Sequence, residues 1–329
     1  MGRLTVVGAG AWGTALAIAA QRAGSRVTLW ARDPLVAAAI NLRHENPCYL
    51  PGVSLDPAIS ATAEIGRAVA DAEAVLLAVP AQFLRGVLAV LRESLSRGRP
   101  VLHCAKGIET GTLATVSEIG AELLPDSPWA VLSGPSFAAE VARGLPTAVT
   151  IASSDPRTAA RFMATLGGSH FRPYLSADPV GAEIGGAVKN VLAIACGIVV
   201  GRGLGDNARA ALITRGLAEM VRLGVARGAQ AETFRGLSGL GDLVLTCGAT
   251  QSRNHALGLA LGRGESLAAV LAGRRSVVEG VATAAAVVEL AARCSVEMPI
   301  SDAVDAVLHR GAPIDEMADR LLRRPYRPE

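Results

Sequence analysis

Short apolar runs rich in β-branched residues alternate with longer helix-like stretches in the first half of the chain. The strand-like runs cover residues 4–7, 26–30, 74–79, 101–104, 129–133, 148–152 and 171–174. The helical stretches cover residues 14–23, 35–41, 81–95, 113–123 and 157–166. Strands and helices that alternate in this way are typical of a parallel sheet covered on both faces, which binds ligands at the carboxyl ends of its strands.

The pattern changes near Asp178, beyond which long Ala, Leu, Val and Arg stretches follow a helical period. Helices are predicted at residues 179–200, 207–224, 255–262, 267–271, 282–292 and 299–309. A chain of 329 residues, half of them apolar, can bury two cores. We therefore predict an α/β dinucleotide-binding domain at residues 1–177, followed by an all-α substrate-binding and catalytic domain at residues 178–329.

A glycine-rich turn joins the first predicted strand to the first helix. Gly8 allows a tight turn, Gly10 lets the backbone approach a pyrophosphate, and Gly13 lets the helix pack closely on the strand. The amides of the turn and the helix N-terminus favour a bound phosphate group. A purely structural glycine turn is the alternative, but the flanking strand and helix favour binding of NAD or NADP.

The end of the second strand bears on the choice between these cofactors. Asp33 lies 20 positions beyond Gly13, about the spacing at which an acidic residue binds the ribose 2′-hydroxyl of NAD. Asp33 also precedes Pro34, so it can instead cap the next helix. Arg32 can meet a 2′-phosphate, and we expect NADPH to be used at least as well as NADH.

Composition argues against several classes of protein. The five cysteines are odd in number, scattered and never spaced as Cys-x-x-Cys, so we expect no disulfide framework, no zinc site and a reducing, cytoplasmic location. Because the N-terminus runs directly into a predicted strand, we expect no signal peptide. The most apolar stretch, residues 191–200, has half of the roughly 20 residues that a membrane span needs. A net charge of +3 without a basic block predicts no nucleic-acid binding.

Lysine is nearly absent from the chain. Of 32 Lys and Arg residues, 30 are arginine, and only Lys106 and Lys189 are lysine. An ammonium is a compact charge whose pKa can be brought into the range of a proton-transfer catalyst, whereas a guanidinium does not deprotonate. Chance survival is the alternative, but neither lysine lies in a charge-rich surface helix. We therefore expect both to act in a site.

Small residues share the helix face of Lys189. They stand three, four or seven positions away and are Ala182, Gly185, Gly186, Ala193 and Cys196. Glycine in a helix costs about 1 kcal/mol relative to alanine, so this pattern predicts that a ligand or another backbone comes close. Asn190 projects about 100° around the helix from Lys189 and can contact substrate or water.

Three later segments contain further candidates. A glycine-rich turn at residues 237–242 ends at Asp242, which can approach Lys189 or cap the following helix. Residues 251–254 form a polar set in which Arg253 offers a forked donor to an anion. Glu279 lies in an apolar, glycine-flanked run, where it either contacts a cofactor or begins a helix.

Six motifs lie in order along the chain, at residues 8–13, 104–108, 132–140, 187–195, 237–243 and 252–254. In order and spacing they resemble the bacterial-type NAD(P)-dependent glycerol-3-phosphate dehydrogenases over nearly the whole chain. The resemblance implies a Rossmann-type domain followed by an all-α domain, as in the 6-phosphogluconate dehydrogenase-like fold. It also implies interconversion of sn-glycerol 3-phosphate and dihydroxyacetone phosphate, supply of glycerol 3-phosphate for phospholipid synthesis, and a homodimer.

The resemblance implies roles for individual residues, with Lys189 as the general acid/base and no metal. The residues expected to bind substrate are Lys106, Gly134, Ser136, Asn190, Asp242, Thr246, Ser252, Arg253 and Asn254. The residues expected to border the cofactor are Gly8, Gly10, Ala11, Trp12, Gly13, Arg32, Lys106, Ala138, Arg253, Val277 and Glu279.

Two alternatives stay open at this point. A β-hydroxyacid or ketopantoate-type reductase shares the glycine loop, a helical second domain and a catalytic lysine, but its substrate ends in a carboxylate. A nucleotide-binding redox sensor without turnover would leave the lysine pair and residues 252–254 without a role. A phosphorylated substrate accounts for both features.

Overall fold

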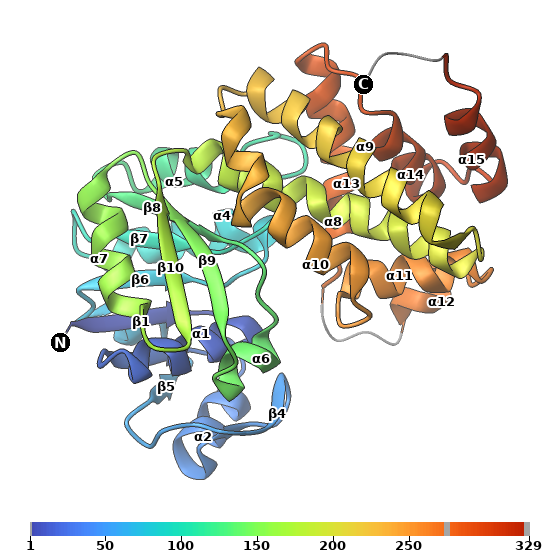
Figure 1. Ribbon diagram of the computed structural model, residues 1–329. Helices are drawn as coiled ribbons and strands as arrows, with labels where there is room; N and C mark the ends of the chain where they lie inside the picture. Colours follow the sequence, from blue (N-terminus) through green and yellow to red (C-terminus); the bar gives the residue numbers. More distant parts are fainter. Residues whose placement is uncertain (1, 273–276, 326–329) are drawn as a thin grey trace. The chain divides into compact units, whose positions relative to one another are not determined.

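The computed structural model describes residues 2–272 and 277–325, and the chain divides into two compact units (Figure 1). The first unit consists of residues 1–105 and 115–183, and the second of residues 106–114 and 184–329. The first five residues of helix α8 (Pro179–Gly201) therefore belong to the first unit. The short segment 106–114, which begins with Lys106, belongs to the second unit.

An eight-stranded sheet forms the centre of the first unit, in the order β10-β9-β8-β7-β6-β1-β2-β5 (Figure 1). Its strands are β1 (Arg3–Val7), β2 (Arg26–Trp30), β5 (Ser60–Thr62), β6 (Ala74–Leu77), β7 (Val101–His103), β8 (Trp129–Ser133), β9 (Thr147–Ala152) and β10 (Phe171–Ser176). Every neighbouring pair is parallel except β8 and β9, which are antiparallel. The predicted α/β architecture with a parallel sheet is confirmed except for this one reversal.

The expectation of a parallel sheet is wrong at this reversal, because the chain turns back directly after β8. The connection contains only the six-residue helix α6 (Ala138–Arg143). Gly134 turns the chain at once, with φ of 136° and its ideal Cβ position 3.0 Å from the Val149 Cα atom. A side chain would not fit there.

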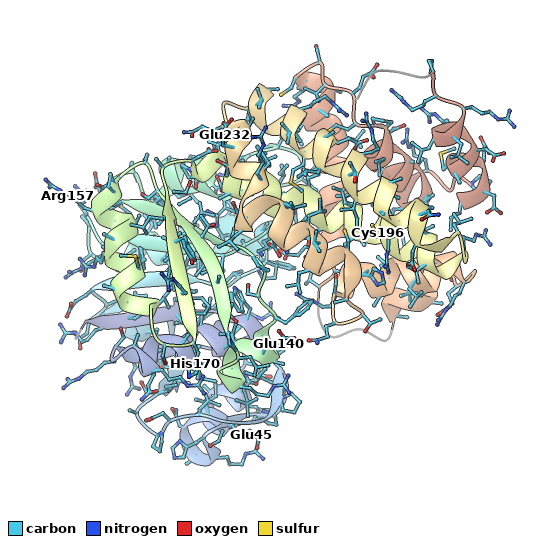
Figure 2. The ribbon with its side chains drawn as sticks, in the orientation of Figure 1. Glu45, Glu140, Arg157, His170, Cys196 and Glu232 are labelled. Carbon is cyan, nitrogen blue, oxygen red and sulfur yellow. The ribbon has the colours of Figure 1, made fainter. Side chains whose placement is uncertain are left out.

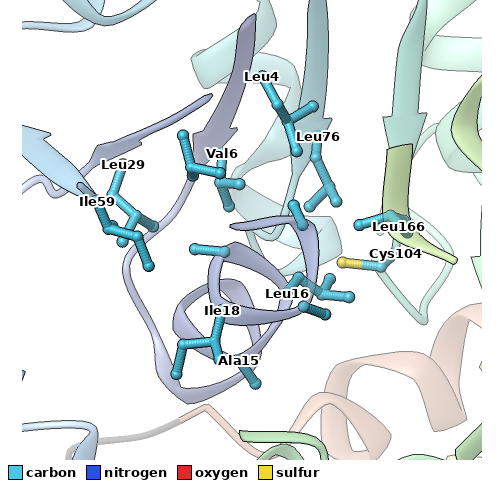
Figure 3. Close-up of a cluster of buried hydrophobic side chains, with 14 of the residues drawn as sticks. Leu4, Val6, Ala15, Leu16, Ile18, Leu29, Ile59, Leu76, Cys104 and Leu166 are labelled. Atoms are coloured by element: carbon cyan, nitrogen blue, oxygen red, sulfur yellow. The ribbon is translucent and has the colours of Figure 1, made fainter. Parts of the chain in front are cut away.

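Helices cover both faces of the sheet. Helix α1 (Ala11–Arg22) packs against α6 and α7 (Pro156–Leu166), whereas α4 (Ala81–Ser94) packs against α3 (Ile65–Val69) and α5 (Val116–Leu123). Figure 3 shows Leu16 and Ile18 of α1 among the strand side chains Val6, Leu29 and Leu76. Helix α2 (Pro34–Arg43) and a two-stranded ribbon, β3 (Glu45–Asn46) with β4 (Leu50–Ser54), complete this unit. The sequence analysis did not predict α3, α6, the ribbon or the edge strand β5.

The second unit contains no strand among its described residues. Its elements after α8 are α9 (Gly205–Ala226), a 3₁₀-helix η1 (Ala231–Arg235), a π-helical turn η2 (Leu237–Gly241), α10 (Asp242–Gly248), α11 (Arg253–Gly262), α12 (Leu267–Ala272), α13 (Glu279–Arg293), α14 (Pro299–His309) and α15 (Ile314–Leu322). The predicted all-helical character is confirmed for the described residues, although η1, η2 and α15 were not predicted as helices. Helices α8 and α11 meet backbone to backbone, because an ideal Cβ on Gly197 would lie 2.1 Å from the His255 carbonyl oxygen.

Helix α8 forms the core of this unit, where its Cys196 side chain lies (Figure 2). It is the one described helix long and apolar enough to span a membrane by length and composition, with mean hydropathy of 1.8 over an 18-residue window. However, 89% of that window is buried inside the protein. A core helix of a globular protein shows this combination.

Candidate active site

Both lysines of the chain converge on one carboxylate in the second unit. The Lys189 Nζ donates to Asp242 Oδ1, and the Lys106 Nζ donates to Asp242 Oδ2. Asp242 is 1% exposed and Lys189 is 6% exposed, so the contact lies almost entirely out of water. Of the two possibilities for Asp242 left open by the sequence, the structure shows the approach to Lys189.

Close backbone packing places Asp242 beneath α8. Asp242 is the first residue of α10 and follows the π-helical turn Leu237–Gly241 directly. An ideal Cβ on Gly185 would lie 2.6 Å from the Ser238 carbonyl oxygen, and one on Gly239 would lie 2.2 Å from the Phe234 carbonyl oxygen. Gly185 therefore admits another backbone, one of the two partners expected for it, and that backbone carries Asp242.

Thr246 completes the surroundings of the Lys189 amine. One turn beyond Asp242, its hydroxyl accepts a hydrogen bond from Lys189 Nζ at 2.9 Å and donates to the Asp242 carbonyl oxygen at 2.6 Å. An ammonium has three N–H donors. Asp242 and Thr246 take two of them, which leaves the third direction for a reacting group.

Burial and neighbouring charges shift the pKa values of Lys189 and Asp242. Burial lowers the pKa of Lys189 to about 7, with Asp242 opposing the shift and Lys106 adding to it. Burial raises the pKa of Asp242, but the two ammonium groups outweigh this and its net pKa is lowered. Asp242 thus stays ionised near neutral pH while Lys189 exchanges a proton there.

Gly280 connects the lysine cluster to the polar segment at residues 252–254. Its N–H donates to Asn254 Oδ1 at 3.0 Å, and an ideal Cβ on it would lie 2.8 Å from the Asn190 carbonyl oxygen. The Asn190 Nδ2 in turn donates to the Lys106 carbonyl oxygen at 3.1 Å. The sequence analysis missed Gly280, although its place at the start of a helix in an apolar run was a usable signal.

The polar segment forms the N-terminus of α11. Ser252 caps this helix, because its hydroxyl accepts the His255 N–H at 3.3 Å. Arg253 is the first helical residue and is exposed, whereas Asn254 is 8% exposed. A helix N-terminus with an arginine beside it favours an anion. Ser252 and Asn254 also accept structural hydrogen bonds, from the His255 N–H and the Gly280 N–H, which the sequence did not predict.

The glycine loop of the first unit has the geometry that a dinucleotide requires. Gly8 has φ of 113°, and its ideal Cβ position is 2.7 Å from the Ala78 carbonyl oxygen. An ideal Cβ on Gly13 would lie 1.8 Å from the Gly8 carbonyl oxygen, so the helix is packed tightly on the turn. Gly10, by contrast, has no atom within 4 Å of its Cβ position, and it precedes α1 without a side-chain cap. This space and the uncapped N–H groups fit a diphosphate.

Asp33 acts as a helix cap in the structure. Its Oδ1 accepts the Leu35 N–H at 2.9 Å and so begins α2, which was one of its two expected roles. Arg32 is exposed at the end of β2. In Rossmann folds the adenosine ribose is recognised near the end of this strand, so the exposed Arg32 and Asp33 both lie at a position that bears on cofactor choice.

The remaining expected residues lie in both units. Trp12, next to Ala11 at the start of α1, and Ala138, at the start of α6, are half-buried against the core of the first unit. Ser136 follows β8 and donates to the Gly134 carbonyl oxygen at 3.0 Å. In the second unit, Val277 is 38% exposed and Glu279 begins α13.

Comparison with known proteins decides the family. Residues 3–159 match the N-terminal model, and residues 178–319 the C-terminal model, of the NAD-dependent glycerol-3-phosphate dehydrogenases. The chain belongs to this family. It is 59% identical, over 99% of its length and 93% of the relative's, to the glycerol-3-phosphate dehydrogenase [NAD(P)+] of Rhodospirillum rubrum. It is 53% identical to that of Caulobacter vibrioides, with 99% and 98% of the two chains covered.

Solved structures agree with this assignment. The crystal structure of glycerol-3-phosphate dehydrogenase from Coxiella burnetii has a TM-score of 0.94 and 37% identity, with 98% of this chain and 99% of that chain covered. A ketopantoate reductase from Ralstonia eutropha has a TM-score of 0.60 at 19% identity, with 98% of this chain and 100% of that chain covered, and shares the fold alone. The family expected from the six motifs is confirmed.

Replacing Gly185 with alanine tests the packing that delivers Asp242. The added Cβ would meet the Ser238 backbone, so we expect a loss of about 1–3 kcal/mol in the free energy of unfolding and a clear loss of catalytic rate. Gly86→Ala, in helix α4 with no atom within 4 Å of its Cβ position, should keep full activity. An active Gly185→Ala enzyme would contradict the role of this contact.

Proposed function

We propose that the chain interconverts sn-glycerol 3-phosphate and dihydroxyacetone phosphate with NAD(P), and that Lys189 is the general acid/base. The observation that supports this most strongly is the buried Lys106–Asp242–Lys189 cluster next to an anion-favouring helix N-terminus, in a chain of this family. We further propose that residues 1–177 bind the dinucleotide and residues 178–329 bind substrate. A cytoplasmic homodimer that supplies glycerol 3-phosphate for phospholipid synthesis completes the proposal.

An absorbance assay at the NADH band tests the function directly. Dihydroxyacetone phosphate should be reduced, while a panel of carboxylated ketones, including a ketopantoate-type substrate, should not. Light scattering on the purified protein tests the homodimer. Turnover of the carboxylated ketones alone would reject the proposed substrate class.

The first unit offers the residues to hold the cofactor. Bound there, NAD(P) would supply the hydride-transfer chemistry for the alcohol–ketone interconversion. Gly8, Gly10, Ala11 and Gly13 would present backbone N–H groups to the diphosphate, because the Cβ position of Gly10 is open and α1 has no side-chain cap. We also propose Trp12, Ala138, Val277 and Glu279 as residues that border the cofactor.

Lys189 moves the proton. As an ammonium it uses two N–H groups on Asp242 and Thr246 and directs the third to the substrate oxygen. After it donates that proton to the forming alkoxide, the neutral amine keeps both hydrogen bonds and its lone pair faces the substrate oxygen. The reverse reaction takes a proton from the alcohol in the same geometry. No side chain must move between the two states.

Lys106, Asn190 and the phosphate cluster orient the substrate. Lys106 is a second ammonium on Asp242 and would stabilise negative charge on the reacting oxygen. Asn190 positions the Lys106 backbone through its hydrogen bond. Arg253, at the N-terminus of α11, would bind the phosphate together with its neighbours Ser252 and Asn254. Gly134 and Ser136 are also proposed as substrate-binding residues.

The pKa of Lys189 sets the pH dependence in each direction. Reduction needs the ammonium, so its kcat/KM should fall as the pH rises through about 7. Oxidation needs the neutral amine, so its kcat/KM should rise through the same pH. Initial rates in both directions, measured from pH 5.5 to about 9, check this. If kcat/KM instead changed near the ordinary lysine pKa in both directions, the role of Lys189 would be contradicted.

The two lysines should respond differently to arginine. Lys189→Arg keeps the charge but cannot exchange a proton, so kcat should fall by about 10²- to 10⁴-fold while NAD(P)H binding persists. Lys106→Arg keeps the cation that stabilises charge and should be milder. The decisive quantity is the ratio of the two turnover numbers, and equal values would remove the distinction between the two roles.

Arg253→Ala should weaken binding of the phosphorylated ketone. Loss of a charge-assisted contact costs about 1.5–3 kcal/mol, so the KM for dihydroxyacetone phosphate should rise roughly 10- to 150-fold. Arg263→Ala is the matched control, because Arg263 is exposed just beyond the opposite end of the same helix. A wild-type KM in Arg253→Ala would make residues 252–254 purely structural.

Arg32→Ala should affect the two cofactors unequally. Because Asp33 is engaged as a helix cap, Arg32 is the proposed partner of the 2′-phosphate, and its loss should raise the KM for NADPH but not for NADH. Steady-state kinetics with both cofactors give the comparison. An equal rise for both would reject this assignment.

A further inference from the structure

Two buried residues, a histidine and a glutamate, have no part in the proposed mechanism. Each lies close in sequence to one of the two lysines. His103 is the last residue of β7 and is fully buried. Its Nε2 lies 3.2 Å from Glu183 Oε1, and the same oxygen accepts the Ser117 N–H at 2.8 Å. His103 precedes Lys106 by three residues, and Glu183 precedes Lys189 by six on helix α8.

A second contact joins the same two segments of chain. Asn190 of α8 donates to the Lys106 carbonyl oxygen at 3.1 Å. Glu183 and Asn190 are seven positions apart and therefore lie on the same face of α8, two turns from one another. One face of α8 thus contacts the segment 103–106 at its first and its last residue.

The lengths of the two segments agree. Seven residues of α-helix rise about 10.5 Å. Three residues of extended chain span at most about 10–11 Å, and His103 ends a strand whose pairing continues in the hydrogen bond from the Cys104 N–H to the Leu77 carbonyl oxygen. The two contacts on α8 are therefore spaced to hold an extended 103–106 segment at both ends.

We propose that His103 and Glu183 are positioning residues, which with Asn190 hold residues 103–106 along α8 and so fix where Lys106 meets Asp242. The proposal rests on the proposed function, in which Lys106 stabilises charge at the reacting oxygen. Release of the His103 end would let Lys106 withdraw from Asp242. The carboxylate would then bind Lys189 alone, without the opposing charge of Lys106.

The contact depends on hydrogen bonding and reach rather than on charge. The His103 Nε2 lies 3.2 Å from Glu183 Oε1 and 3.4 Å from the Ser117 hydroxyl, whereas its Nδ1 is buried without a hydrogen-bond partner among the described residues. A proton on Nδ1 would be a buried, unpartnered donor, which is costly, whereas a proton on Nε2 can be donated to Glu183. A glutamine at position 183 offers an acceptor at the same reach. An aspartate keeps the charge but is shorter by one methylene.

Three variants of Glu183 test whether the contact depends on hydrogen bonding and side-chain reach or on charge. In Glu183→Asp and Glu183→Leu, the pH limb of kcat/KM that lies near 7 in the wild type should move up by roughly half a unit or more, and the KM for dihydroxyacetone phosphate should rise. Glu183→Gln should restore the wild-type limb. If charge alone matters, the order reverses and Glu183→Asp is the one that resembles the wild type, which would overturn the proposal.

Glu219 provides the matched structural control. It is a buried glutamate that accepts the N–H groups of Ile300 and Ser301 at the start of α14. Glu219→Leu should lower the melting temperature without moving the limb. If Glu183→Asp and Glu183→Leu also lower only the melting temperature and leave the pH limb unmoved, His103 and Glu183 are structural only. Should Glu183→Leu fail to fold, the comparison of Glu183→Asp with Glu183→Gln decides.

A readout independent of turnover keeps this test separate from the proposed function. NMR of lysine labelled with ¹⁵N at the side chain, recorded across pH, reports the titration of Lys189 in each variant. If the wild type fails to reduce dihydroxyacetone phosphate, the proposed function fails, while the Lys189 titration profiles still test the positioning. Identical Lys189 profiles in the wild type and Glu183→Asp would overturn it.

Discussion

A single buried carboxylate, Asp242, binds both lysines of the chain, and the arrangement of the helical unit around it serves this contact. Two ammonium groups share one negative charge, so full protonation leaves an excess positive charge out of water. The cluster relieves this by lowering the pKa of the more buried lysine to about 7. The same imbalance that makes the cluster costly makes Lys189 suited to exchange a proton.

Glycine is what allows the helices to come near enough for this contact. Gly185 admits the backbone that carries Asp242, and Gly280 admits both Asn190 and Asn254. At Gly197, helix α8 meets α11, which presents the anion-favouring segment. Each close approach brings a polar group to a place that a side chain would otherwise fill. In this unit the small residues are therefore part of the site as much as the charged ones.

Local sequence predicted the elements well, but not their partners. The runs at residues 26–30, 129–133 and 299–309 appear with the expected bounds, because hydrophobic period and capping are local properties. The direction of β9 was missed, since alternation of strands and helices carries no information on strand direction. Gly185 signalled a close approach without identifying Ser238 as its partner. Similarly, nothing local joined His103 to Glu183, 80 residues later.

The most direct test of the account is the titration of Lys189 itself. Because the chain contains only two lysines, lysine labelled with ¹⁵N at the side chain gives two amine signals, and a Lys106→Arg sample assigns them. NMR across pH should show Lys189 losing its proton near pH 7 in the wild type. In Lys106→Arg the proton should be lost at a higher pH only if the guanidinium does not bind Asp242 in place of the Lys106 ammonium. A Lys189 signal that titrates near the ordinary value of about 10.4 in the wild type would contradict the account.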